Sequence, residues 1–229
     1  MTTTVRRFID RARTAPLWQQ AVVVFLSAAL ITALFSAAAM AQGPKVTPLK
    51  EMARGSGNAK VTVTEYGSVT CTHCASWYTT NWTKFERDYI KTGKVRFVYR
   101  EVATNPSNMA FGVYMLGHCA AAKPNWIGMK GGTRAYFTVI DGFFAAQSKV
   151  YETGEVEPVL KSLAQKTGLN NAELESCLNN EALFKSIATR MEANMDKDNV
   201  NSTPTFFVNG KRVNSDYASI EAAIKAASK

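Results

Sequence analysis

A Cys-x-x-Cys motif, Cys71-Thr72-His73-Cys74, lies between a predicted strand and a predicted helix. Alternating residues over Val61–Tyr66 indicate the strand, and helical spacing of aromatic residues begins directly after the motif. Unpaired backbone N–H groups and partial positive charge at the start of a helix favour a thiolate on the first cysteine. The thiolate is the form that attacks and leaves in thiol–disulfide exchange. The motif therefore predicts a redox-active cysteine pair at a strand–helix junction.

Strand signals occur on both sides of a long helical region. The helix after the motif is predicted to end at Gly93, and a second strand follows at 95–99, which completes a parallel crossover unit. Strand character returns at 205–208 and 211–213, joined by a hairpin turn at Asn209-Gly210, and a last helix follows. Because neither group of strands closes a sheet alone, we predict that both belong to one sheet.

The resulting fold class is α/β, with an all-helical subdomain inserted into the sheet domain. The sheet domain is predicted to comprise residues 59–104 and 198–229, and the insertion residues 105–197. Residues 42–58 are read as a lead-in or linker that ends in a flexible Gly-Ser-Gly stretch.

Helical periodicity and local signals predict individual helices within the insertion. Asn105 and Pro106 are typical of an N-cap followed by proline at the first helical position, and this helix is expected to reach Ala122. A second helix is predicted over about 133–147, and three shorter helical patterns follow before residue 198.

The N-terminal residues 1–41 have the order of a secretory signal. No charged residue occurs from Thr14 to Pro44, the apolar centre is Ala21–Phe35, and Ala39-Met40-Ala41 suits a signal peptidase. An uncleaved anchor is the alternative, because Ala21–Ala41 could just span a bilayer. Either reading places the rest of the chain in the periplasm, where disulfides persist, and the second reading anchors it to the inner membrane.

The net charge of +9 does not indicate nucleic-acid binding. Three of these charges belong to the basic N-terminal segment, and the remaining Lys and Arg residues are scattered without forming a basic arm. A mildly basic, solvated surface explains the charge.

Half of a zinc site has the same Cys-x-x-Cys form, so a metal site is one alternative reading of the motif. Zinc needs two further ligands at suitable spacing, whereas Cys119 and Cys177 lie far along the chain and His73 lies between the two cysteines. An inert structural disulfide is a second alternative. We predict no metal at this motif and no cofactor.

The chain resembles the DsbA family of exported thiol–disulfide oxidoreductases, which have a thioredoxin fold with an inserted helical domain. The resemblance covers about residues 50–229 and is carried by these residues: Val61–Cys74; Tyr136, Phe137, Asp141, Phe144 and Gln147; and Ser202–Gly210. The resemblance implies that Cys71 is the nucleophile and Cys74 its buried partner. It further implies that His73 stabilises the Cys71 thiolate, and that Glu65 is a buried acid that passes protons to and from Cys74.

The resemblance also assigns a substrate-binding role to Thr203 and Pro204. Pro204 matches the cis-proline that lies beside the cysteine pair in this family and presents backbone groups to a substrate strand. An ordinary trans proline that opens a strand is the alternative. Thr203 stands where the archetypal oxidase has valine, and threonine also occurs there in isomerase and reductase relatives.

Two further cysteines, Cys119 and Cys177, both fall on inward-facing stripes of predicted helices. The likeness is to alphaproteobacterial-type members with a second cysteine pair, so we predict a structural disulfide between them; two buried free thiols are the alternative. Such a bond would stabilise the fold by about 4 kcal/mol on the chain-entropy model. His118 is expected at the helix surface, and Met191 and Met195 on a core-facing stripe rather than at a copper site.

The leading functional prediction is a periplasmic dithiol oxidase that donates its Cys71–Cys74 disulfide to newly exported proteins. The resemblance implies reduced exported proteins as substrates and a quinone-linked membrane reoxidase of the DsbB type as a partner. A disulfide isomerase or reductase of the same fold is one alternative. An envelope protein that binds copper or zinc through Cys71, His73 and Cys74 is the other.

Overall fold

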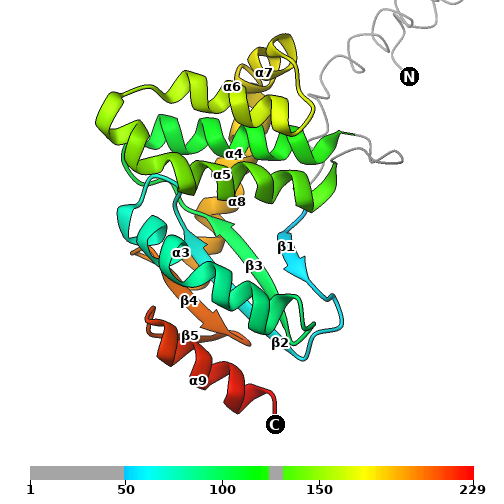
Figure 1. Ribbon diagram of the computed structural model, residues 1–229, viewed down its shortest axis with the longest axis vertical. Coiled ribbons are helices and arrows are strands. Elements are labelled where there is room, and N and C mark those ends of the chain that lie inside the picture. Colours follow the sequence, from blue (N-terminus) through cyan, green and yellow to red (C-terminus); the bar gives the residue numbers. More distant parts are fainter. Residues whose placement is uncertain (1–48, 124–130) are drawn as a thin grey trace, which may run out of the picture. The chain divides into compact units, whose positions relative to one another are not determined.

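The computed structural model describes residues 49–123 and 131–229, and a mixed β-sheet lies at the centre of this part of the chain (Figure 1). Its strands have the order β1-β3-β2-β4-β5. Their bounds are Met52–Gly55 for β1, Val61–Gly67 for β2, Val95–Glu101 for β3, Thr205–Val208 for β4 and Lys211–Val213 for β5. The predicted signal peptide, residues 1–41, lies outside the described residues.

The central strands β2 and β3 are parallel, and the other neighbouring strands pair antiparallel. Helix α3 (Thr72–Phe85) and the short π-helix η1 (Glu86–Ile90) connect β2 to β3. This is the crossover unit predicted from the sequence, and the α/β fold class is confirmed. Helix α9 (Tyr217–Ala227) follows the β4–β5 hairpin.

Strand β1 was not predicted, because it lies within the segment read as a linker. Its residues pair with β3, with Arg54 opposite Phe97. The Arg54 guanidinium carbon lies 3.6 Å from the centroid of the Trp82 ring, and its nitrogens donate to Asp141 and to the Tyr78 hydroxyl. The packing of an arginine on aromatic rings leaves no local signal in the sequence. The segment therefore has no alternating apolar pattern from which a strand could be predicted.

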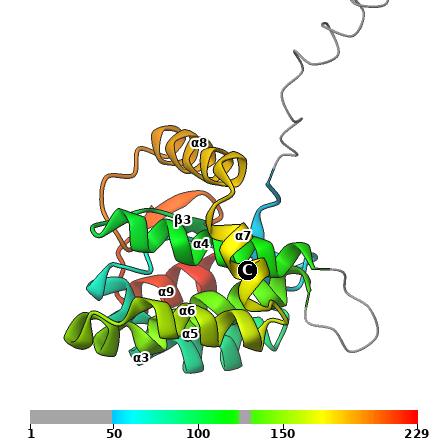
Figure 2. The same ribbon diagram turned by 90° about the horizontal axis from the view of Figure 1, so that it is seen from above.

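Helices α4–α8 stand between β3 and β4 in the chain, where the helical insertion was predicted. Figure 2 shows α8 on the opposite side of the sheet from α3. The bounds of these helices are Ser107–Ala122 for α4, Gly132–Thr153 for α5, Val156–Lys166 for α6, Asn171–Leu178 for α7 and Glu181–Lys197 for α8.

Two predicted helix boundaries in the insertion were wrong. Pro106 is the N-cap of α4 rather than its first residue: its ψ of 115° is extended, and the peptide bond before it is cis. Helix α5 continues beyond Gln147 to Thr153, and Gly154 is its C-cap, whose φ of +73° suits glycine.

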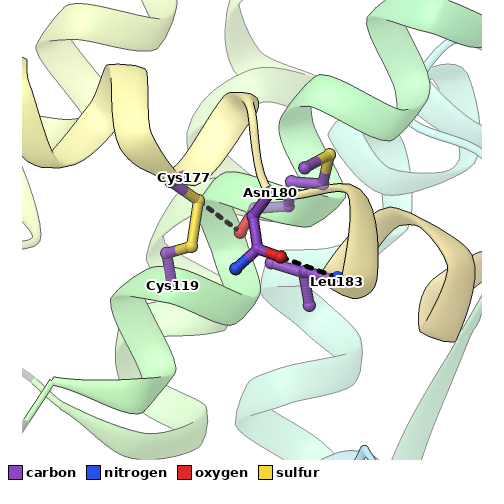
Figure 3. Close-up of a disulfide and its surroundings, with 5 residues drawn as sticks. Cys119, Cys177, Asn180 and Leu183 are labelled. Carbon is purple, nitrogen blue, oxygen red and sulfur yellow. Dashed lines mark hydrogen bonds between the residues drawn. A yellow bond between two sulfur atoms is a disulfide. The ribbon is translucent and has the colours of Figure 1, made fainter. Parts of the chain in front are cut away.

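A disulfide joins α4 to α7 in the structure. Cys119 and Cys177 are bonded across a sequence separation of 58 residues, and Asn180 caps α8 beside them by accepting a hydrogen bond from the Leu183 N–H (Figure 3). The cysteines of the Cys-x-x-Cys motif are both free thiols.

The prediction that His118 lies at the helix surface was wrong. The histidine is buried, and its Nε2 lies 2.7 Å from a carboxylate oxygen of Glu101 at the end of β3. The Tyr136 hydroxyl of α5 donates to the same carboxylate, and Arg190 of α8 forms an ion pair with it. This cluster of four residues, the Glu101 cluster, ties three helices of the insertion to one strand.

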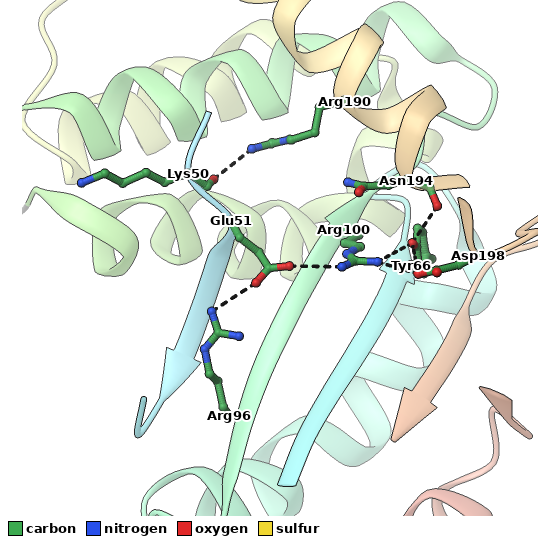
Figure 4. Close-up of polar contacts among 8 residues, drawn as sticks. All are labelled: Lys50, Glu51, Tyr66, Arg96, Arg100, Arg190, Asn194 and Asp198. Carbon is green, nitrogen blue, oxygen red and sulfur yellow. Dashed lines mark hydrogen bonds and ion pairs between the residues drawn. The ribbon is translucent and has the colours of Figure 1, made fainter. Parts of the chain in front are cut away.

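Polar contacts also connect strand β3, and the residue before β1, to the end of α8. Glu51 pairs with Arg96 and with Arg100, and Arg100 reaches Asp198 at 2.6 Å after the end of α8 (Figure 4). Nearby, Met195 packs half-buried against a small apolar cluster, and Met191 accepts a hydrogen bond from a backbone N–H. Both methionines therefore serve packing and backbone contacts.

Candidate active site

The first cysteine of the motif caps helix α3. The backbone of Cys71 is extended, with φ −85° and ψ 122°, and its Sγ accepts a hydrogen bond from the Cys74 N–H at 3.4 Å. Strand β2 ends four residues earlier, and the loop between them turns the chain so that Cys71 faces the start of the helix. The sulfur therefore lies in the positive field of the helix N-terminus.

The two thiols of the motif lie in different environments. Cys71 is half-buried, whereas Cys74 is fully buried and its Sγ accepts from the Ser68 N–H at 3.4 Å. A hydrogen bond with the Cys74 side chain, opposed by burial and aided by contacts with Thr203 and two backbone N–H groups, lowers the pKa of Cys71 to about 5. Burial raises the pKa of Cys74 far above its ordinary value. Cys71 is thus the ionised, accessible thiol of the pair.

The predicted buried acid, Glu65, lies beneath the site on β2. Its side chain is 1% exposed. Burial, with help from the nearby Cys71 and against the field of Arg54, raises its pKa from 4.5 to about 8. This carboxyl is therefore mostly protonated at neutral pH.

Gly67 and Tyr99 complete the environment of Glu65, and no sequence pattern indicates either role. Tyr99 is opposite Glu65 in the β2–β3 register. A Cβ atom added to Gly67 would lie 2.7 Å from Glu65 Oε1 and 2.7 Å from a ring carbon of Tyr99. Only glycine leaves room for both side chains to meet at this position.

The predicted substrate-binding residues lie beside the cysteine pair. The Thr203–Pro204 peptide bond is cis, and the Thr203 carbonyl oxygen lies 3.5 Å from Cys71 Sγ. The two residues also line an open pocket of about 540 Å³, together with His73 and Trp77.

His73, for which the resemblance implies stabilisation of the Cys71 thiolate, lies at the start of α3. Its imidazole is exposed, and among the described residues no hydrogen bond joins it to Cys71. The His73 backbone makes the smallest of the contributions that lower the Cys71 pKa, after the Cys74 side chain, Thr203 and the Cys74 backbone. His73 also lines the pocket beside Pro204.

The metal-binding alternative gains no support from the geometry. Across residues 49–123 and 131–229, no group of three or more His, Cys, Asp or Glu side chains is arranged to hold a metal ion.

None of the helices in residues 49–123 and 131–229 combines the length and the apolar character that a membrane span requires.

We expect the Glu65→Gln substitution to change how stability depends on pH. Between pH 4.5 and about 8 the folded protein keeps a proton on Glu65 that the unfolded chain releases, so the free energy of unfolding falls as pH rises through this window. Glutamine cannot ionise and removes that slope. Urea unfolding of the reduced proteins at about pH 5 and about pH 9 measures it; equal slopes in both proteins would show that Glu65 does not titrate in this range.

A parallel-centred sheet, a helix that starts at a dithiol pair and a cis-proline beside it define a thioredoxin-fold protein with a helical insertion, of the DsbA type. The sequence model of the family described as Thioredoxin matches residues 47–226. The chain therefore belongs to the thioredoxin family.

Known relatives agree with this assignment. A protein-disulfide oxidoreductase of Rickettsia bellii is 26% identical over 180 residues, which cover 76% of this chain and 65% of that protein. The chain thus spans slightly less than two thirds of this relative.

Solved structures share the fold. Oxidised BdbD from Bacillus subtilis superposes with a TM-score of 0.67 at 22% identity, over 78% of this chain and 92% of that one. Alpha-DsbA1 from Wolbachia pipientis gives a TM-score of 0.63 at 21% identity, over 79% and 90% of the two chains.

Proposed function

We propose that this protein is an exported thiol–disulfide oxidoreductase that works as a dithiol oxidase. The observation that carries the proposal is the asymmetry of the cysteine pair: Cys71 is accessible with a pKa of about 5, and Cys74 is buried with a raised pKa. A stabilised thiolate favours the reduced form of the protein, which makes its disulfide oxidising.

The proposed reaction has two exchange steps. A substrate thiolate attacks the Cys71 sulfur of the oxidised protein, the Cys71–Cys74 bond breaks, and the Cys74 sulfur leaves with the electron pair. A second substrate thiolate then attacks the substrate sulfur of the mixed disulfide, and Cys71 leaves as a thiolate. The substrate loses two electrons and gains a disulfide, while the protein becomes the dithiol.

Each remaining site residue has a proposed role in these steps. Glu65, protonated at neutral pH, supplies the proton that the departing Cys74 sulfur takes up. Thr203 and Pro204 present backbone groups to the substrate segment, because the Thr203 carbonyl lies next to the reacting sulfur. His73, which lines the same pocket as Thr203 and Pro204, stabilises the Cys71 thiolate.

The cellular setting is part of the proposal. The predicted signal sequence supports export to the periplasm, and the name of the relative, a protein-disulfide oxidoreductase, supports protein thiols as substrates. A quinone-linked membrane reoxidase of the DsbB type would accept the two electrons. Residues 59–104 and 198–229 would carry the reacting groups and residues 105–197 the helical subdomain.

Refolding of ribonuclease separates an oxidase from an isomerase or reductase. We expect the oxidised protein to restore the activity of reduced ribonuclease in a stoichiometric reaction, because Cys71 is the better leaving thiolate. Faster recovery from scrambled ribonuclease than from the reduced form would favour an isomerase, which the threonine before Pro204 also permits. No reaction with either substrate would contradict the proposal.

A further inference from the structure

Two side chains of α5 hold the backbone of the loop that precedes the active-site helix. The Gln147 Nε2 donates to the carbonyl of Val69 at 2.7 Å and to the carbonyl of Cys71 at 3.2 Å. The Tyr151 hydroxyl donates to the carbonyl between them, that of Thr70. Side chains of the helical insertion thus donate hydrogen bonds to three consecutive backbone carbonyls just before α3.

The two side chains reach the same loop because they are four residues apart on one helix face. Gln147 is 3% exposed, and both hydrogens of its amide have partners in the loop. Tyr151 is 41% exposed, so only its hydroxyl end is committed to the loop. We call these two residues the loop clamp.

The position of this loop decides how well the helix stabilises the Cys71 thiolate. The hydrogen bond from the Cys74 N–H to Cys71 Sγ is 3.4 Å long and depends on where the loop places Cys71. A small shift of Cys71 would lengthen it and would also change the distance to Thr203. In addition, the clamp donors offset the partial negative charge of carbonyls close to the thiolate.

We propose that Gln147 and Tyr151 are positioning residues for thiol–disulfide exchange: through three loop carbonyls they hold Cys71 in the geometry that favours its thiolate. The helical insertion then sets the oxidising strength of a cysteine pair that belongs to the sheet domain. This inference rests on the proposed function for its biological meaning, but its effect on the Cys71 thiol is measurable without any substrate.

The test compares three variants of the full chain. Gln147→Ala removes two donors, Tyr151→Phe removes one hydroxyl and keeps the ring, and Ser148→Ala changes an exposed neighbour on α5 with no hydrogen bond to the loop. The readouts are the Cys71 thiol pKa, from thiolate absorbance against pH, and the equilibrium constant with glutathione.

We expect Gln147→Ala to lower the oxidising equilibrium constant about tenfold, which equals about 30 mV for a two-electron couple, with a rise in the Cys71 pKa. Tyr151→Phe should lower it about threefold, and Ser148→Ala should leave it unchanged. Unchanged pKa and equilibrium constant in both clamp variants would overturn the inference, even if their stability fell, because a purely structural role predicts that pattern. Tyr151→Phe alone decides if Gln147→Ala fails to fold.

Failure of the clamp and failure of the proposed function give different results. A wild-type protein that oxidises ribonuclease, with clamp variants identical to it, leaves the oxidase proposal standing and rejects the clamp. A wild-type protein that oxidises nothing rejects the oxidase proposal, while a raised Cys71 pKa in the clamp variants still supports positioning.

Discussion

Replacing Cys74 with serine should trap this protein on its substrates as a stable mixed disulfide. The Cys71 thiolate can still attack disulfides already formed in substrate proteins, which reverses the second exchange step. No second thiol then remains within the pair to release the mixed disulfide. Serine also keeps a hydroxyl donor near Cys71, so the thiolate itself should persist. Non-reducing electrophoresis of periplasmic extracts, with and without reductant, measures the trapped species.

The matched variant Cys71→Ser should form no such adduct. At pH 7 a thiol with a pKa of about 5 is almost fully ionised, whereas the buried Cys74, with its raised pKa, is ionised to less than about 1%. The rate of exchange should therefore fall more than about a hundredfold. Adducts of similar amount in both variants would contradict the assignment of Cys71 as the nucleophile.

The Glu101→Ala substitution should cause the largest loss of stability that we predict. Glu101 is 4% exposed and binds His118, Tyr136 and Arg190 at once. Its loss leaves these polar groups without a partner, and breaking a buried ion pair from one side costs about 3–5 kcal/mol. Because the Arg190 side chain is 23% exposed, we expect the lower end, about 3 kcal/mol. Urea unfolding at pH 7 measures the change.

Glu51→Ala is the control, because Glu51 also pairs with two arginines but is exposed. Its loss should cost less than about 1 kcal/mol. A similar loss for both variants would show that the Glu101 cluster contributes no more than a surface ion pair.

The Glu101 cluster should also make stability depend on pH. Burial opposes ionisation of Glu101, but His118, Arg190 and Tyr136 outweigh it and lower its pKa from 4.5 to about 2. A depressed pKa means that the stabilisation is fully present above pH 4.5 and is lost as pH falls toward about 2. The variant Glu101→Gln should lack this part of the acid-induced loss, as unfolding at about pH 3 against pH 7 would show.

Local sequence patterns predicted the elements that carry the cysteine pair. Alternation in β2 placed Glu65 on the buried face, and the spacing after Cys74 predicted the helix that follows. The Asn209-Gly210 turn likewise indicated the β4–β5 hairpin. In each case the signal and the structure lie within a few residues of each other.

Features that depend on distant residues were not predictable in the same way. Strand β1 relies on Arg54 packing against Trp82, and His118 is buried because Glu101, on another element, accepts its hydrogen bond. Gln147 was part of the resemblance, yet only the structure places its amide on the active-site loop. Such side chains look polar and exposed in sequence because their partners are unknown until the chain is folded.

Titration of the Cys71 thiol, in protein in which only the Cys71–Cys74 pair is reduced, tests the central claim most directly. The Cys119–Cys177 disulfide does not titrate, and the raised pKa of Cys74 removes it from the range, so thiolate absorbance reports on Cys71 alone. We predict a single transition with a pKa of about 5. A transition near 9, the ordinary value for a cysteine thiol, would contradict the account.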